Sequence, residues 1–147
     1  MKHIKVSVVN TGNQPLPEYK TALSSGMDLR ADIQQPVTLA PLERFLFLTG
    51  IHINLPDGYE AQVRSRSGLS SEHGIAVVNG IGTIDADFTG NIGVPLINLS
   101  NVPFTVYPGD RIAQLVIAPV VQVDWNPVGQ LEETERGDGG WGHTGMK

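Results

Sequence analysis

The chain contains no cysteine and no long apolar run. With no cysteine among its 147 residues, it can form neither disulfides nor thiolate metal sites, a composition typical of a reducing compartment such as the cytoplasm. No stretch approaches the ~18 apolar residues that cross a bilayer. Residues 1–5 lack the apolar run of a signal peptide. We therefore expect a cytoplasmic or other reducing intracellular location and no membrane partner.

Positive charge is also scarce. Ten Lys and Arg against fifteen Asp and Glu give a formal net charge of −5. This argues against binding to long nucleic acid, which needs a basic surface, but a small anionic ligand responds to local charge instead. The alternative is an ordinary charged surface. Five of the six arginines lie in or beside Gly- and Asp-rich segments: Arg30, Arg64, Arg66, Arg111 and Arg136.

Turn residues and short alternating runs dominate what is present. Seventeen glycines and ten prolines at close spacing disfavour long helices. Apolar and polar residues alternate in several runs, which predicts half-buried strands. The segment 112–123 is nearly all apolar and β-branched, so it predicts a strand buried on both faces. The alternating runs are 4–8, 51–55, 59–63 and 92–96.

A single short helix is predicted over 67–73, with Ser67 as a possible cap at its start and Gly74 ending it. The length suits one hydrophobic core. Short strands with regular turns predict an all-β sandwich, jelly roll or barrel. Composition separates a body over 1–135 from a Gly-rich C-terminal arm over 136–147.

The arm has five glycines in nine residues, and it also carries Arg136 and Trp141. Glycine adds no side chain to a core, whereas an arginine fork matches phosphate oxygens and an indole ring stacks on a base. The arm therefore indicates a lid over a nucleotide. The alternative is a disordered chain end.

Two upstream segments also suit a phosphate ligand. In 24–31, Asp28 and Arg30 lie two apart on a predicted strand and share a face; the alternative is an exposed ion pair of little energetic value. In 64–69, serine hydroxyls and free N–H groups at the helix start form an anion site. The alternative there is an ordinary capped helix.

Two further segments carry acidic and amide groups. The glycines of 79–90 predict a hairpin with accessible backbone, where Asp85 and Asp87 share one side around Phe88. An aspartate beside a nucleotide acts as a general base or a metal ligand; the alternative is a turn with solvated aspartates. Gln114 enters the apolar strand after a Pro-Gly-Asp turn. A buried amide needs partners, so it binds either backbone or ligand.

Together, in this order and spacing, the five segments resemble the five motifs of the homotrimeric dUTP diphosphatases (dUTPases). The resemblance implies a distorted β jelly roll (a β-clip barrel) that assembles as a homotrimer. It implies that one chain supplies the first, second and fourth motifs of each site, a second chain the hairpin, and a third chain the arm. The matching runs span about residues 24–145 and read SGMDLRA, RSGL, GTIDADFTGNIGV, PGDRIAQLVI and RGDGGWGHTG.

The reaction implied by this resemblance is hydrolysis of dUTP to dUMP and pyrophosphate. Water attacks the α-phosphorus, and Mg²⁺ is bound across the three phosphates. Such an enzyme limits uracil incorporation into DNA and supplies dUMP for dTMP synthesis. The resemblance implies no protein carboxylate as a direct metal ligand.

Roles follow position by position from the same resemblance. Asp85 is the expected catalytic residue, which orients and deprotonates the attacking water, and Asp28 supports the phosphate and metal region indirectly. Expected substrate contacts are Arg66, Ser67, Gly68 and Gln114 at the phosphates, Arg136 at the γ-phosphate, Asn79, Thr83 and Ile84 at uracil through backbone atoms, Phe88 at the deoxyribose, and Trp141 with Gly142 on the arm over uracil.

Two positions depart from the commonest family pattern. Phe88 stands where a tyrosine usually lies under the deoxyribose, so the phenol's hydrogen bonds are absent. Trp141 replaces the usual phenylalanine that stacks on uracil. His143 has two open interpretations, a phosphate contact or a surface residue of the arm.

Three other functions compete with dUTP hydrolysis. A dCTP deaminase of the same superfamily would need a glutamate base near the pyrimidine, where this chain has TIDADF. A non-catalytic, nucleotide-gated regulator would use the same arm; the intact Asp85 argues against lost catalysis but not against an added partner. A purely structural jelly-roll protein would not need the full motif set.

Overall fold

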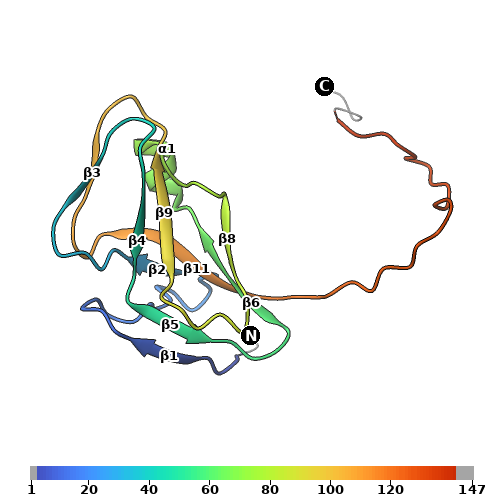
Figure 1. The fold of residues 1–147 in the computed structure, drawn as a ribbon, viewed down its shortest axis with the longest axis horizontal. Coiled ribbons are helices and arrows are strands. Elements are labelled where there is room, and N and C mark those ends of the chain that lie inside the picture. The colour runs from blue at the N-terminus through green and yellow to red at the C-terminus, as the bar shows by residue number, and fades with distance from the viewer. Residues whose placement is uncertain (1–2, 142–147) are drawn as a thin grey trace.

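The computed structural model describes residues 3–141; residues 1–2 and 142–147, which include Gly142 and His143, lie outside the described residues. Within the described part the chain forms eleven strands and one helix (Figure 1). In chain order they are β1 (Ser7–Asn10), β2 (Met27–Arg30), β3 (Val37–Leu39), β4 (Arg44–Leu48), β5 (Ile51–Asn54), β6 (Tyr59–Arg64), α1 (Ser67–His73), β7 (Ile75–Val77), β8 (Ile81–Ile84), β9 (Gly93–Asn98), β10 (Phe104–Val106) and β11 (Arg111–Pro119).

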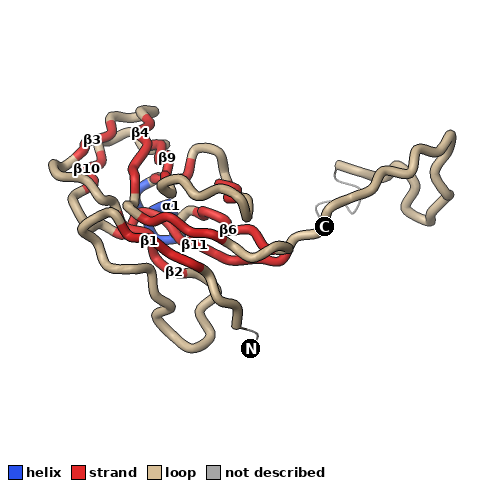
Figure 2. Tube along the Cα trace, turned by 60° about the horizontal axis from the view of Figure 1, so that its bottom comes forward, coloured by secondary structure: helices blue, strands red, loops and turns tan. Residues whose placement is uncertain are grey.

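The strands of the described residues pair in four antiparallel sheets (Figure 2). One has the order β2-β11-β6-β8, a second has the order β4-β9-β7, and the ribbons β1-β5 and β10-β3 complete the set. Buried side chains from both larger sheets belong to one cluster, among them Leu29 and Leu115 from the first and Phe47 and Leu96 from the second. The two sheets therefore share one core, and the prediction of an all-β body with one short helix is confirmed.

Three of the alternating runs form strands where they were expected. β5, β6 and β9 cover most of the predicted segments, and buried residues alternate along each of them. The run 4–8 is shifted to β1, and all four residues of β1 are exposed. Half-burial holds at Ile4 and Val6, and Val6 packs against the core, but it is wrong at Val8, because β1 pairs only with β5 and lies at the rim of the fold (Figure 1).

The strand predicted over 112–123 is too long, since β11 ends at Pro119. Proline has no N–H to donate to a ladder and is disfavoured inside sheets. Burial on both faces holds at Ile112 and Ala113, but Gln114 is exposed, and Val121 beyond the strand is 96% exposed. From there the chain runs outward from the body as an extended segment (Figures 1 and 2).

The helix has the predicted bounds but not the predicted cap. Gly74 ends α1 in the left-handed conformation, φ 68°, and its N–H bonds the carbonyls of Leu69 and Ser70, as expected for a glycine stop. Ser67 is the first helical residue, so Arg66 occupies the N-cap position and no side chain caps the helix. Within residues 3–141 no helix is long and apolar enough to span a membrane.

One buried amide joins three segments of the body. Asn98, at the end of β9, is fully buried. Its Nδ2 donates to the carbonyls of Leu39 at 3.0 Å and Val102 at 2.8 Å, and its Oδ1 accepts from the N–H of Ser100 at 2.9 Å. Every polar atom of the side chain is satisfied, so the amide stabilises the fold.

We expect Asn98→Leu to lower the free energy of unfolding by about 2–3 kcal/mol, because the buried Leu39 carbonyl, the Val102 carbonyl and the Ser100 N–H lose their partner. Urea unfolding followed by fluorescence measures the change. Asn101→Leu is the matched control, since Asn101 is exposed in the same turn, and it should change the free energy by less than about 0.5 kcal/mol. Equal effects of the two substitutions would contradict this role of Asn98.

Candidate active site

Asp28 lies between two guanidinium groups. Its Oδ1 is 3.1 Å from Arg66 Nε, and its Oδ2 is 3.3 Å from Arg111 Nη1. The Asp28 side chain is only 14% exposed. The ion pair between Asp28 and Arg30, the alternative interpretation of segment 24–31, is not formed: Arg30 Nη1 donates to the Gly109 carbonyl at 2.7 Å. Residues i and i+2 of an extended strand are roughly 6–7 Å apart. Arg66 and Arg111, which come from other segments, lie closer to the Asp28 carboxylate.

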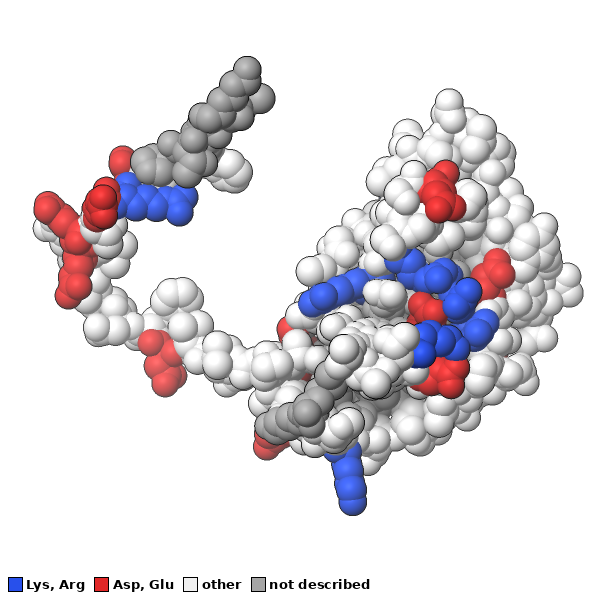
Figure 3. Space-filling view, turned by 180° about the vertical axis from the view of Figure 1, so that it is seen from behind, with Lys and Arg blue, Asp and Glu red and all other residues white. Residues whose placement is uncertain are grey.

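The two arginines also bind each other's segments. Arg66 Nη1 donates to the backbone carbonyl of Arg111 at 2.8 Å. Both line a cavity of about 250 Å³ between α1, β10 and the start of β11. Basic side chains gather around acidic ones on this side of the body (Figure 3). Asp28 and its two guanidiniums together carry one net positive charge, and Asp110 also lines the cavity. The guanidiniums suit an anionic ligand.

The sheet register brings the predicted segments into one row. Gln114 of β11 lies opposite Asp28 of β2 and also opposite Arg64 of β6, which in turn lies opposite Ile81 of β8. Directly opposed residues of antiparallel strands point to the same face. Gln114 is exposed, so the expectation of a buried amide is wrong: its side chain points to the outer face of the sheet, beside Asp28.

The start of α1 is open to solvent. Ser67 and Gly68 are exposed, and the space where a Gly68 Cβ would stand is empty. Ser65 Oγ accepts from the N–H of Val77 at 2.8 Å, and its own O–H remains a donor. With no side chain capping the helix, the first N–H groups remain available to phosphate oxygens.

The hairpin expected over 79–90 is not a two-stranded ladder. The chain reverses at Asn79 and Gly80, but β7 pairs with β9 whereas β8 pairs with β6. β8 is an edge strand of its sheet, so it offers one line of backbone N–H and C=O groups. Thr83 is exposed, while Ile84 is buried in the core. The Ile84 side chain therefore serves packing.

Asp85 follows β8 and begins a turn. Its carbonyl accepts from the N–H of Phe88 at 3.1 Å, so the period-two reasoning that placed Asp85 and Asp87 on one side does not apply. Asp85, Asp87 and Phe88 are all exposed. Within residues 3–141 no group of three acidic or histidine side chains is placed to hold a metal ion.

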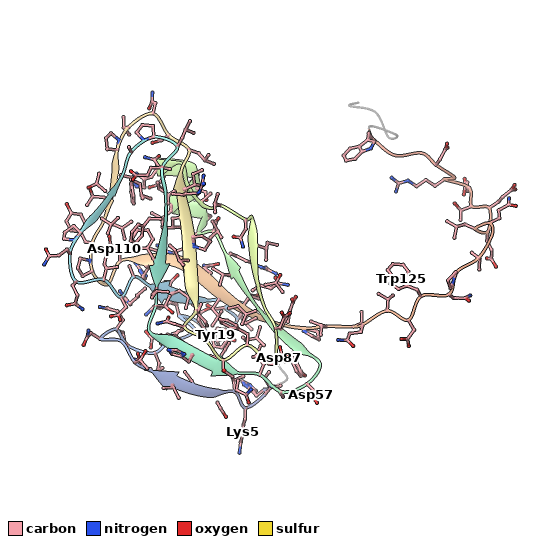
Figure 4. All side chains as sticks on the ribbon, in the orientation of Figure 1. Lys5, Tyr19, Asp57, Asp87, Asp110 and Trp125 are labelled. Carbon is pink, nitrogen blue, oxygen red and sulfur yellow. The ribbon has the colours of Figure 1, made fainter. Side chains whose placement is uncertain are left out.

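Asp85 and the arginine cluster lie at opposite ends of the sheet. Ile81 pairs with Arg64 near the cluster, and Asp85 is four residues further along β8, roughly 13 Å away at strand spacing. Figure 4 places Asp110, the neighbour of Arg111, and Asp87, which lies in the Asp85 turn, on opposite sides of the body. Within one chain, the expected base and the phosphate contacts do not meet.

The arm residues are also apart from the body. Arg136 is exposed, and its Nε donates to the Gly139 carbonyl at 2.8 Å. Trp141 is fully exposed. The chain from Val120 onward extends away from the strands, with Trp125 well outside them (Figure 4). The structure thus brings Asp28, Arg66 and Gln114 together, but not the hairpin or the arm.

The sequence interpretation gave Arg111 no site role. Only its place beside a Pro-Gly-Asp turn set it apart among the arginines, and nothing in its spacing linked it to residue 28. The register of β2 on β11, which shifts between Arg111 and Ala113, places its guanidinium on the Asp28 carboxylate.

Known proteins resemble this chain over nearly its whole length. A family model described as dUTPase matches residues 12–145. A protein of Finegoldia magna named deoxyuridine 5'-triphosphate nucleotidohydrolase is 51% identical, covering 97% of this chain and 99% of that protein. One of Ehrlichia canis with the same name is 54% identical, covering 97% and 95%.

Solved structures resemble it as well. The Staphylococcus bacteriophage 80alpha dUTPase with dUPNHPP has a TM-score of 0.87 at 26% identity, covering 97% of this chain and 99% of that one. A dUTPase of phage phi11 of S. aureus, described for the coordination of a structural Mg(II) ion, has a TM-score of 0.79 at 24% identity, covering 88% and 100%. These likenesses support the prediction of a jelly-roll-like all-β fold. With the five motifs in place and the family model covering most of its length, the chain belongs to the dUTPase family.

Proposed function

We propose that this chain hydrolyses dUTP to dUMP and pyrophosphate, the activity that its relatives' names state for those proteins. One structural observation carries the proposal. In a chain of net charge −5, Asp28, Arg66 and Arg111 form a cluster with excess positive charge beside the uncapped helix start and the exposed Gln114. This arrangement suits a triphosphate, because guanidiniums, free N–H groups and an amide all donate to phosphate oxygens.

Asp85 is proposed to act on the attacking water. The carboxylate orients the water and accepts its proton while the oxygen bonds to the α-phosphorus, and the bond from that phosphorus to the pyrophosphate oxygen breaks. Phosphoryl transfer depends chiefly on positioning and on stabilising charge. Arg66, Ser67, Gly68 and Gln114 therefore serve as phosphate contacts, with Arg136 of the arm at the γ-phosphate.

The site is proposed to be shared among three chains of a homotrimer. Asp85 lies roughly 13 Å along the strand from the row of Ile81 and Arg64, which adjoins the arginine cluster, and this separation supports a site that draws on more than one chain. A second chain would bring its Asp85 turn to the arginine cluster of the first. The arm, whose described residues 136–141 do not belong to the core of their own chain, would close from a third.

Base and sugar selection are proposed to come from β8 and the turn that follows it. Asn79, Thr83 and Ile84 would present backbone groups to the uracil edge, as a pairing partner does, and the donor pattern of cytosine would mismatch them. A single methyl in an apolar contact discriminates only ~10–200-fold, so exclusion of thymine needs steric closure. Phe88 would pack against C2′ of the deoxyribose and leave no room for a 2′-hydroxyl. On the arm, Trp141 would stack on the base with Gly142 beside it.

Mg²⁺ is proposed as the cofactor, held by the substrate's phosphates. The donor set fits this arrangement, because both carboxylate oxygens of Asp28 are engaged by guanidiniums and the carboxylate is not free to bind a cation directly. When bound, the ion would neutralise charge on the three phosphates. Asp28 would act by holding Arg66 and Arg111 in place.

Pyrophosphate release in the presence of Mg²⁺ tests the proposed function. We expect release from dUTP and little from dTTP, dCTP or UTP, because each of these alters a contact described above. Deamination of dCTP would instead support the deaminase alternative. No release from any nucleotide by the folded protein would contradict the hydrolase and favour a nucleotide-gated regulator.

Asp85→Asn should lower kcat for dUTP about 10²–10⁴-fold, the usual contribution of a general base, with binding of dUTP retained. Stopped-flow proton release and calorimetric binding measure the two quantities. The matched control is Asp87→Asn, an exposed aspartate in the same turn, which should stay within about threefold of the unchanged protein. Full turnover of the Asp85 variant would remove this residue as the base.

Removal of residues 136–147 should leave a folded trimer with very low turnover, because Arg136 and Trp141 touch none of the core. Light scattering measures the assembly and pyrophosphate release the turnover. Co-assembly with the Asp85→Asn chain should restore part of the activity, since some mixed sites would combine an intact arm with an intact Asp85. Failure of the truncated chain to assemble would contradict the lid; no restoration would contradict the shared site.

A further inference from the structure

Two side chains of β5 reach backbone carbonyls of the loop that carries Asp85 and Phe88. His52 Nδ1 is 3.0 Å from the Thr89 carbonyl oxygen. Asn54 Nδ2 makes a longer contact, 3.5 Å, with the Ala86 carbonyl oxygen. The two side chains lie two residues apart on an extended strand, so they share one face of β5. β5 therefore holds the loop on both sides of Phe88.

The contact with Thr89 decides the protonation of the His52 ring. A carbonyl oxygen only accepts, so Nδ1 carries the hydrogen and donates it. Nε2 lies 3.2 Å from the hydroxyl oxygen of Thr11, which also donates its hydrogen to the Gly50 carbonyl at 3.2 Å. The Thr11 backbone is fixed in turn, because its N–H donates to the Gly50 carbonyl at 2.8 Å. The ring is thus held at both nitrogens between the end of β1 and the loop.

The far end of the loop is anchored separately. Asn91 Oδ1 accepts from the N–H groups of Thr49 at 3.3 Å and Gly50 at 3.0 Å, and the N–H of Ile92 donates to the Ile51 carbonyl at 2.8 Å. These bonds fix the chain from 91 onward. Among the hydrogen bonds of the described residues, that of His52 is the side-chain anchor between residue 91 and Phe88.

The Phe88 ring depends on this stretch of backbone. A Cβ built on Gly90 would lie 2.6 Å from Phe88 Cζ, so the ring packs directly on the Gly90 backbone. The ring is 46% exposed and has no polar atom that would hydrogen-bond a neighbour. Its position is therefore set by packing and by the path of residues 88–90, and that path is held at Thr89.

We propose that His52 is a positioning residue for sugar discrimination. By holding the Thr89 carbonyl it fixes the position of the Phe88 ring relative to the sugar. In that position the ring leaves space for a hydrogen at C2′ but not for a hydroxyl. His52 itself touches no substrate. This inference rests on the proposed function, in which Phe88 packs under the deoxyribose of dUTP. Loss of the anchor lets the ring move aside, which admits a ribonucleotide while dUTP still fits.

Two amide substitutions distinguish the contributions of the two ring nitrogens of His52. The Asn side chain places its amide near the position of Nδ1, so His52→Asn keeps a donor for the Thr89 carbonyl. The longer Gln side chain reaches toward the position of Nε2, so His52→Gln keeps the partner of Thr11 and loses the Thr89 bond. His52→Ala removes both. Thr11→Val is the matched control, because it removes the hydroxyl contacts with His52 Nε2 and with the Gly50 carbonyl and leaves the Thr89 bond in place.

The measurement is kcat/KM for dUTP and for UTP, from pyrophosphate release by the full-length protein with Mg²⁺. We expect the dUTP-to-UTP ratio to fall about fivefold to tenfold in His52→Ala and His52→Gln, the value of one hydrogen bond. His52→Asn and Thr11→Val should keep the ratio of the unchanged protein. A loss of stability alone would lower both rates and leave the ratio in place.

The outcomes separate this inference from the proposed function. No hydrolysis of dUTP by the unchanged protein would overturn both. Hydrolysis of dUTP with an unaltered ratio in His52→Gln would overturn the role of His52 alone, and so would an unchanged protein that hydrolyses UTP as readily as dUTP. If His52→Ala fails to fold, the comparison of His52→Gln with His52→Asn decides the question.

Discussion

The carboxylate of Asp28 is the interaction on which the arrangement of the site depends. A carboxylate that is 14% exposed is unfavourable unless it is paired, and removing one partner of such a pair is strongly destabilising. Asp28 is paired twice, with Arg66 ahead of α1 and Arg111 at the start of β11. It therefore joins three segments that are distant in the chain, and it keeps two guanidiniums side by side that would otherwise repel each other. The excess positive charge that results is local, in a chain whose net charge is negative.

Strand length sets the second constraint. β8 carries the chain from the row that contains Gln114 and Arg64 to the turn at Asp85, a distance of roughly 13 Å. A strand cannot fold back within that length, so one chain cannot place its own aspartate on its own arginine cluster. This geometry supports the proposal that the site is divided among chains. The chain leaves the body after Pro119 and Trp141 of the arm is fully exposed, which suits the proposed lid over a neighbouring chain's site.

Particular elements show what could be predicted from the sequence. The helix over 67–73 was predicted with its correct bounds, because Gly74 must take a left-handed conformation that other residues avoid. Strands β5, β6 and β9 follow from alternation, which is a local property. Gln114 was wrongly expected to be buried, since its apolar neighbours do not reveal which face of the sheet is covered. The hairpin over 79–90 was wrong for a similar reason: adjacency along the chain did not decide that β7 and β8 pair with different strands.

By itself the sequence determined the all-β class, the single short helix, the Gly-rich arm and, through five motifs, the dUTPase family. These depend on residue type, local spacing and similarity to relatives, all of which are present in the linear chain. Only the tertiary structure decided that Asp28 pairs with Arg66 and Arg111 instead of Arg30, that Gln114 faces outward beside it, and that His52 reaches the Thr89 carbonyl. Each of these joins residues from separate strands or loops, and the register of antiparallel strands, which no local pattern specifies, decides which of them meet.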